Sequence, residues 1–122
     1  MTRQEQLLVR AMEECNELAQ RISKALIFGM DEVQQDPHQN PDNKTNEDRI
    51  YDEYFDLRAT LGMAGIDAWR RDDRARMAER FKREKVERYM VMSQQLGRLE
   101  PTPDERRSVP PPRFADATLD EV

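Results

Sequence analysis

The residues best suited to chemistry in this sequence are two groups of carboxylates. The first lies within the run Glu13-Glu14-Cys15-Asn16-Glu17, and the second is the pair Glu53 and Asp56. If their segments are helical, Glu14 lies one turn from Glu17, and Glu53 one turn from Asp56. Like charges at this spacing destabilise a helix unless a cation neutralises them. Carboxylates suit Mg²⁺ or Mn²⁺ better than Zn²⁺, so two such pairs on adjacent helices predict a site for a hard divalent cation.

A simpler interpretation of the same acids is a solvated helix surface. Glu13 and Glu17 have Arg10 and Arg21 within a turn along the chain, and ion pairs of this kind are common on exposed helices. Both acidic pairs, however, lie at or near the edge of an apolar stripe, where a purely solubilising charge is least needed. This placement favours the metal site.

The segments that carry the two groups both predict helices. In residues 3–28 apolar side chains recur every three or four positions, which predicts one helix ending at Gly29. Its apolar stripe consists of Leu8, Ala11, Cys15, Ala19, Ile22 and Leu26, widened by Leu7, Leu18 and Ala25. Thr45 followed by acids predicts the start of a second helix that runs to about residue 66. Its stripe consists of Ile50, Tyr54, Leu57, Leu61 and Ala64, with Phe55, Ala59, Met63 and Ile66 on a second, weaker face.

The remaining segments predict a loop, a third helix and a tail. Residues 30–44 are rich in Gln, Asn, Asp and Pro, and we expect a long loop that is functional or mobile. Residues 67–73 predict a break or a short link, and residues 74–96 predict a basic third helix. Residues 99–122 are rich in proline and predict an extended or disordered tail, so we expect one domain over residues 1–98.

Composition limits the kind of protein this chain forms. It has 122 residues, of which 37% are charged and 37% apolar, with a mean hydropathy of -1.00. Such a chain builds a small core, so we expect an all-α helical bundle that assembles into a homodimer or homotetramer. A net charge of -5 gives no general attraction to nucleic acid or to an anionic membrane. The chain has one cysteine and no apolar run of roughly 20 residues, and we expect a soluble cytoplasmic protein.

The order and spacing of the acids resemble the signature of a known family. The pattern Glu13-Glu14-x-x-Glu17 followed by Glu53-x-x-Asp56 is similar to that of the MazG-like, all-α nucleoside triphosphate pyrophosphohydrolases, which include dimeric dUTPases and dCTPases. The flanking segments SKALIFG at residues 23–29, NEDRI at residues 46–50 and KVERY at residues 85–89 also look like short, single-domain members of that group. The resemblance covers residues 7–97, and the long polar insert departs from it.

The resemblance implies an enzyme that requires Mg²⁺, with Mn²⁺ as an alternative ion. Such an enzyme cleaves a ribo- or deoxynucleoside triphosphate between the α and β phosphates and releases the monophosphate and pyrophosphate. On this hypothesis Glu14, Glu17, Glu53 and Asp56 hold the metal, and Glu13 and Glu14 are the catalytic candidates. Glu13 is a ligand, a residue behind the ligands or a partner for water, and the sequence leaves these alternatives open.

Three basic residues are candidates to contact phosphate. Lys24 lies two turns after Glu17 on the same side of the predicted helix, where an ammonium group could meet a phosphate. Arg49 lies one turn before Glu53 and could orient that carboxylate or touch phosphate. Lys85 could approach the triphosphate from the third helix. The alternative for each is a charge on a solvated helix surface.

The candidates for the nucleoside are one amide and several aromatic rings. Asn16 could read the base or sugar, and Phe28, Tyr54 and Trp69 could stack on the base. The alternatives are a solvated polar residue for Asn16 and core packing for the rings. For the whole chain, the alternatives to an enzyme are a non-catalytic helical interaction module and a protein that binds nucleotide without turnover.

Overall fold

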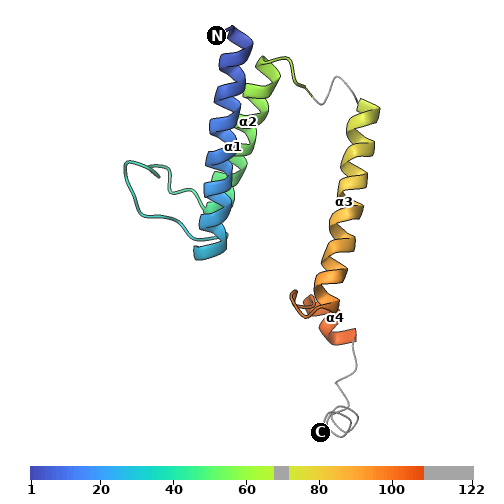
Figure 1. Cartoon of the computed structure of the whole chain (residues 1–122). Coiled ribbons are helices and arrows are strands. Elements are labelled where there is room, and N and C mark those ends of the chain that lie inside the picture. The colour runs from blue at the N-terminus through green and yellow to red at the C-terminus, as the bar shows by residue number, and fades with distance from the viewer. Residues whose placement is uncertain (68–71, 109–122) are drawn as a thin grey trace, which may run out of the picture. The chain divides into compact units, whose positions relative to one another are not determined.

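The computed structural model describes residues 1–67 and 72–108, and Figure 1 shows that this part of the chain is built from helices. The helices are α1 (Arg3–Phe28), α2 (Asn46–Met63), α3 (Asp72–Gln95) and the short α4 (Pro103–Ser108). The extended structure in these ranges is a single bridge between Val33 and Thr45. The predicted all-α class is confirmed. No helix within the described ranges is long and apolar enough to cross a membrane.

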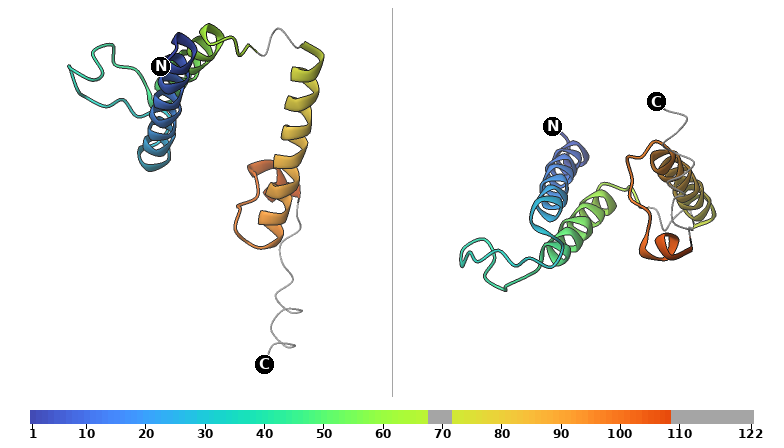
Figure 2. Two further views of the ribbon diagram at one scale, coloured as in Figure 1. Left: turned by 45° about the horizontal axis from the view of Figure 1, so that its top comes forward. Right: turned by 90° about the horizontal axis from the view of Figure 1, so that it is seen from below.

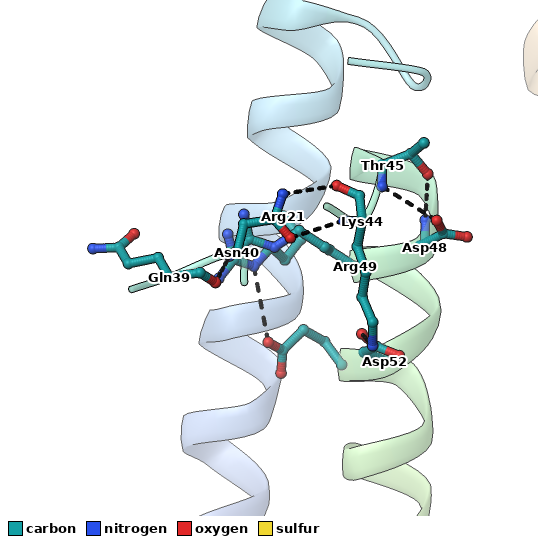
Figure 3. Close-up of polar contacts among 9 residues, drawn as sticks. Arg21, Gln39, Asn40, Lys44, Thr45, Asp48, Arg49 and Asp52 are labelled. Carbon is teal, nitrogen blue, oxygen red and sulfur yellow. Dashed lines mark hydrogen bonds and ion pairs between the residues drawn. The ribbon is translucent and has the colours of Figure 1, made fainter. Parts of the chain in front are cut away.

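Capping boxes start both α1 and α2. Thr2 Oγ1 accepts the Glu5 backbone N–H at 3.1 Å, and the Glu5 carboxylate accepts the Thr2 N–H at 2.6 Å. Thr45 and Asp48 make the same reciprocal pair at 3.1 and 3.2 Å (Figure 3). α1 is followed by Gly29, whose φ of 99° disfavours any residue with a side chain. The predicted bounds of α1 and the predicted start of α2 are therefore confirmed.

α1 and α2 form an antiparallel pair within the unit Met1–Asp72 (Figures 1 and 2). At one end of the pair, Gln4 Nε2 donates to the Ala64 carbonyl at 3.0 Å. At the other end, Asn46 Nδ2 donates to the Gly29 carbonyl at 2.8 Å. The start of each helix is thus bonded to the end of the other, which brings side chains far apart in sequence into register.

The face of α1 that packs on α2 is offset from the centre of the predicted stripe by one residue toward the N-terminus. The buried and half-buried positions of α1 are Leu7, Ala11, Glu14, Leu18, Arg21 and Ala25, with Lys24 at their margin. Of the predicted stripe, Ala11 and the three widening residues Leu7, Leu18 and Ala25 belong to this set. Leu8, Ile22 and Leu26 are instead 38%, 44% and 83% exposed. The prediction was wrong about the centre of the packed face because α1 has two adjacent apolar rows, and periodicity alone does not say which one meets α2.

The predicted stripe of α2 is confirmed except at one position. Ile50, Leu57 and Leu61 are half-buried and Ala64 is buried, but Tyr54 is largely exposed because it lies beyond the edge of the contact face. Among the described residues the buried apolar side chains are Ala11, Ala25 and Ala64. The α1–α2 pair therefore has a thin interior made of small residues.

Residues 30–44 form the predicted long loop, and buried polar groups fix its path. Asn40 is 4% exposed, and its Nδ2 donates to the carbonyls of Gln34 and Lys44 at 2.9 and 3.0 Å. Its Oδ1 accepts the Lys44 N–H at 3.0 Å (Figure 3). Asn46 is 3% exposed and also donates to the Glu32 carboxylate at 2.6 Å. These bonds give the loop an ordered route from α1 to α2.

The second unit, Asp73–Val122, contains most of α3 and all of α4. The predicted third helix is confirmed, with Gly97 at a φ of 71° after its end. The extended tail predicted for residues 99–122 is wrong at Pro103–Ser108, which is helical, because a proline is well suited to the first turn of a helix. Residues 109–122 and Trp69 lie outside the described residues, and a domain over residues 1–98 stays a prediction.

Candidate metal centre

Carboxylates from α1 and α2 meet where these two helices pack together. Glu14 on α1 and Glu53 and Asp56 on α2 each offer one oxygen, and these oxygens all lie within 4.8 Å of one another. Glu14 and Glu53 are half-buried in the contact face between the helices, whereas Asp56 is exposed at its margin. The helical pairing thus assembles one group from the two acidic motifs.

Glu17 lies beside this group but is not among the three carboxylates whose oxygens lie within 4.8 Å of one another. Its proximity and charge raise the pKa of both Glu14 and Glu53. A helix turns 100° per residue, so Glu17 and Asp56, each one residue before a contact position, lie on the same side of the antiparallel pair. The structure therefore brings three of the predicted ligands within reach of one ion and places Glu17 on the same side of the helix pair. We call the four residues together the acidic cluster (Glu14, Glu17, Glu53 and Asp56).

Electrostatics in the acidic cluster disfavour four separate negative charges. Burial, followed by the hydrogen bond and the charge of Glu17, raises the pKa of Glu53 from 4.5 to about 7. Burial also raises the pKa of Glu14, with the charges of Glu17 and Asp56 as the next causes. Glu14 Oε2 and Glu53 Oε2 are buried with no hydrogen-bond partner. A buried carboxylate oxygen without a partner is costly, and an all-oxygen donor set of this kind fits Mg²⁺ or Mn²⁺.

Arg21 is a site residue that the sequence interpretation missed. Its Nε lies 3.9 Å from Glu53 Oε1, and its Nη1 is buried with no hydrogen-bond partner. The sequence interpretation treated it only as a surface partner of Glu17. Its position three residues after Leu18 and seven after Glu14 is the signal that places it on the inner face of α1. Arg21 thus borders the acidic cluster with an available donor.

We expect Arg21→Gln to move metal binding to higher pH. Removing the cation near Glu53 favours the protonated carboxyl, so its pKa rises further and a metal ion competes with the proton less well. Apparent Mn²⁺ affinity at pH 7 should fall by about tenfold, the lower end of the effect of partners behind metal ligands. Calorimetric titration at pH 6.5, 7.5 and 8.5 measures this. Arg21→Lys should recover part of the lost affinity. If Arg21→Gln and the unchanged chain bind Mn²⁺ with equal affinity at all three pH values, the prediction is contradicted.

Arg49 contacts the loop rather than the acidic cluster. It is 6% exposed, and its guanidinium donates to Gln34 Oε1 at 3.2 Å. It also donates to the Gln39 carbonyl at 3.3 Å (Figure 3). Burial, followed by the charge of Arg21, lowers its pKa. The structure thus gives Arg49 a role in holding the loop, and its contact with phosphate stays a prediction.

Among the other candidates on α1, the structure brings neither Glu13 nor Asn16 into the acidic cluster. Glu13 is exposed and pairs with Arg10 at 3.4 Å. Asn16 is exposed and lies about half a turn round the helix from the face that meets α2. Lys24 is half-buried on the same side of α1 as Glu17, two turns further along. Of these three residues, Lys24 is the one whose position suits a ligand bound at the acidic cluster.

Phe28 and Lys85 lie apart from this group in the chain. Phe28 is 60% exposed at the end of α1, two residues before the loop begins at residue 30. Lys85 belongs to the second unit, where its Nζ lies 5.9 Å from the ring centre of Tyr89. Their contact with substrate stays a prediction.

Comparison with known proteins does not assign the acidic cluster to a family. The cluster therefore has to be interpreted from its own geometry: three carboxylates that meet between antiparallel helices with Glu17 beside them, two oxygens without partners and a neighbouring arginine. The chain matches no protein-family model, no curated protein and no solved structure.

Proposed function

We propose that this chain is a Mg²⁺-dependent nucleoside triphosphate pyrophosphohydrolase of the MazG-like, all-α type. The observation that carries the proposal is the meeting of Glu14, Glu53 and Asp56 oxygens within 4.8 Å of one another, at the motif positions. Glu17 adds a fourth carboxylate from the same motif. The substrate is a ribo- or deoxynucleoside triphosphate, and the products are its monophosphate and pyrophosphate.

The roles of the chain's own groups follow from their positions. The acidic cluster holds the divalent ion, which when bound offsets phosphate charge and acidifies a water molecule. The exposed Asp56 and Glu17 form the rim of the cluster from which a triphosphate approaches. Lys24 lies on that side of α1 and binds phosphate oxygens as a point charge. Arg21 orients Glu53 and favours its ionised form against the surrounding acids, since its Nε lies 3.9 Å from that carboxylate.

The chain acts as a homodimer or homotetramer in this proposal. Its described part buries only Ala11, Ala25 and Ala64 among apolar residues, which is a thin interior for a stable fold. A further copy would cover more apolar surface. A cytoplasmic location and a role in clearing nucleotide pools are part of the same proposal.

The test is pyrophosphate release from a panel of nucleoside triphosphates, with and without Mg²⁺. Mutating a residue that hydrogen-bonds a metal ligand typically lowers metal affinity or activity about 10–100-fold. Loss of a direct ligand in Glu14→Gln, Glu17→Gln or Glu53→Gln should therefore lower kcat/KM at least ~100-fold. Glu84→Gln is the matched control, because Glu84 is exposed on α3 and pairs with Arg80. Full activity in all three cluster variants, with circular dichroism unchanged, would reject the proposal.

A second candidate function is a non-catalytic helical interaction module. The exposure of Leu8, Ile22 and Leu26 on α1 favours it, since a row of exposed apolar side chains marks an interaction surface. Mg²⁺-dependent thermal stabilisation separates this candidate from the enzyme. Stabilisation by Mg²⁺ and triphosphate without release of pyrophosphate would indicate a nucleotide-binding protein without turnover.

A further inference from the structure

One side of α3 combines basic and aromatic side chains and contains no acid. This side, here called the basic face, falls within an arc of about 140° of the helix, since each residue turns the chain by about 100°. All of its residues are exposed, and the acids Glu79, Glu84 and Glu87 lie outside the arc. The basic face consists of Arg74, Met77, Ala78, Phe81, Lys82, Lys85, Arg88, Tyr89 and Met92.

Two acids of α3 pair with other basic residues, on the remaining surface of the helix. Arg80 Nε donates to Glu84 Oε1 at 3.2 Å, and Arg83 Nη2 donates to Glu79 Oε1 at 2.7 Å. Among the described residues, no carboxylate lies within ion-pair distance of the basic residues on the basic face. The basic face therefore presents positive charge that the rest of α3 does not neutralise by direct pairing.

We propose that the basic face binds single-stranded nucleic acid. Its ammonium and guanidinium groups contact phosphates, and the rings of Phe81 and Tyr89 stack on nucleobases. The two rings are 61% and 57% exposed and lie about 12 Å apart along the helix axis. Lys85 lies midway between them, with its Nζ 5.9 Å from the Tyr89 ring centre. Because stacking and phosphate contacts carry no sequence information, the binding has no strong sequence preference.

The interleaving of charges and rings favours this occupant over an apolar one. Lys85 follows Phe81 by four residues and precedes Tyr89 by four, so a lipid surface or an apolar groove that covered both rings would also bury its charge. An acidic polypeptide would neutralise the charge but would leave the rings without a nucleobase to stack on. A nucleic acid strand repeats a phosphate and a nucleobase in every unit, so it provides a partner for both kinds of side chain.

This binding does not depend on the proposed hydrolysis. The net charge of -5 gives the whole chain no general attraction to nucleic acid, but the excess of acidic residues lies in the unit Met1–Asp72, which contains the acidic cluster. The basic face belongs to the unit Asp73–Val122. Measurements in EDTA keep divalent ions from the acidic cluster, so they report on the basic face alone. Lys85 is also a candidate for the triphosphate, and competition with a nucleoside triphosphate separates the two roles.

The first test is fluorescence anisotropy of labelled oligo(dT) and oligo(U) with the full chain in EDTA, over a series of NaCl concentrations. We expect dissociation constants of roughly 10⁻⁶–10⁻⁴ M near physiological salt, and a slope of about -3 in log K against log salt, because each basic residue on the face contributes about -0.7. Lys85→Gln should reduce the slope to about -2. Arg76→Gln is the matched control, since Arg76 is exposed on α3 outside the basic face, and it should leave the slope unchanged. No binding of either strand, or equal effects of the two variants, would overturn the proposal.

The second test removes a ring without changing the charge. Phe81→Ala should weaken binding of either strand roughly 5- to 150-fold, the loss expected for one nucleobase stacked on an aromatic side chain. Met90→Ala is the matched control, because Met90 is 42% exposed on α3 outside the basic face, and it should bind as the unchanged chain does. Circular dichroism should show the same helix content in both variants. Equal binding by Phe81→Ala and Met90→Ala would overturn the proposal, since the rings would then play no part.

Competitors identify the occupant of the basic face. Unlabelled oligo(dT) should displace the labelled strand at a lower concentration of charge than polyglutamate, phosphatidylserine vesicles or a nucleoside triphosphate. If polyglutamate or the vesicles displace the strand as well as oligo(dT) does, the face is a surface for acidic protein or for lipid, and the proposal is overturned. Equal displacement by the nucleoside triphosphate would also overturn it, because Lys85 would then belong to a site for the free nucleotide.

Discussion

Glu53→Gln should make the metal-free protein more stable at pH 8 and abolish its stabilisation by Mg²⁺. The pKa of Glu53 is raised to about 7 by burial and by the neighbouring acids, so above pH 7 the folded chain contains a carboxylate charge that its surroundings disfavour. Glutamine keeps the shape and removes that charge. Each pKa unit is worth ~1.4 kcal/mol, so the free energy of unfolding should rise by roughly 1–3 kcal/mol in the variant.

The pH dependence of the unchanged, metal-free protein has a definite sign. Between pH 4.5 and about 7 the folded state keeps a proton on Glu53 that the unfolded state has released. The free energy of unfolding therefore falls as pH rises through this window and levels off above it. Above pH 7, Mg²⁺ at 100 times its dissociation constant should raise the free energy of unfolding by ~2.7 kcal/mol. In Glu53→Gln the pH slope should be much smaller and the stabilisation by Mg²⁺ should be absent.

Chemical denaturation at pH 5, 6, 7 and 8, with EDTA or with 10 mM Mg²⁺, measures both effects. Glu84→Gln removes an exposed carboxylate on α3 and serves as the control, which should keep the pH slope and the Mg²⁺ response. A Glu53→Gln protein that is less stable than the unchanged chain at pH 8 with EDTA, and still stabilised by Mg²⁺, would contradict the prediction.

The helices and the acidic cluster could be predicted from sequence because each depends on local spacing. The capping residues Thr2 and Thr45 mark helix starts through bonds to residues three positions away, which a sequence displays directly. The acids of each motif lie one turn apart, so helix formation alone places them on one side. Only the contact between the two motifs depends on the packing of α1 against α2, which brings Glu14 within reach of Glu53 and Asp56.

What the sequence could not decide was the choice between neighbouring faces. Leu7 and Leu8 begin two apolar rows of α1 that differ by one residue, and either row could meet α2. The choice made in the structure turns Arg21 inward and leaves Ile22 44% exposed. Arg49 shows the same limit, because its burial depends on a loop path set by contacts ten and fifteen residues away in sequence.

Asn46→Ala should destabilise the protein by about 2–4 kcal/mol and loosen the loop. Asn46 is 3% exposed, and its Nδ2 donates to the Gly29 carbonyl at 2.8 Å and to the Glu32 carboxylate at 2.6 Å. A neutral hydrogen bond is worth ~1 kcal/mol and one to a charged group ~1.5–3 kcal/mol, and alanine removes both while leaving their acceptors unpaired. One side chain thus joins the end of α1, the loop and the start of α2.

Asn46→Asp gives the sharper version of this prediction. Aspartate keeps the shape of asparagine but places a second carboxylate beside Glu32, so the loss of unfolding free energy at pH 7 should exceed that in Asn46→Ala. At pH 4 this loss should be smaller, because a protonated carboxyl group can donate a hydrogen bond to the other one. Denaturation at both pH values gives the free energies, and tryptic cleavage after Lys44 reports loosening of the loop. Gln35→Ala, in the same loop but exposed, should change stability by no more than ~0.5 kcal/mol. If alanine and aspartate cost no more than this control, Asn46 does not hold the loop, and the other bonds of the loop, including those of Asn40 and Arg49, set its path.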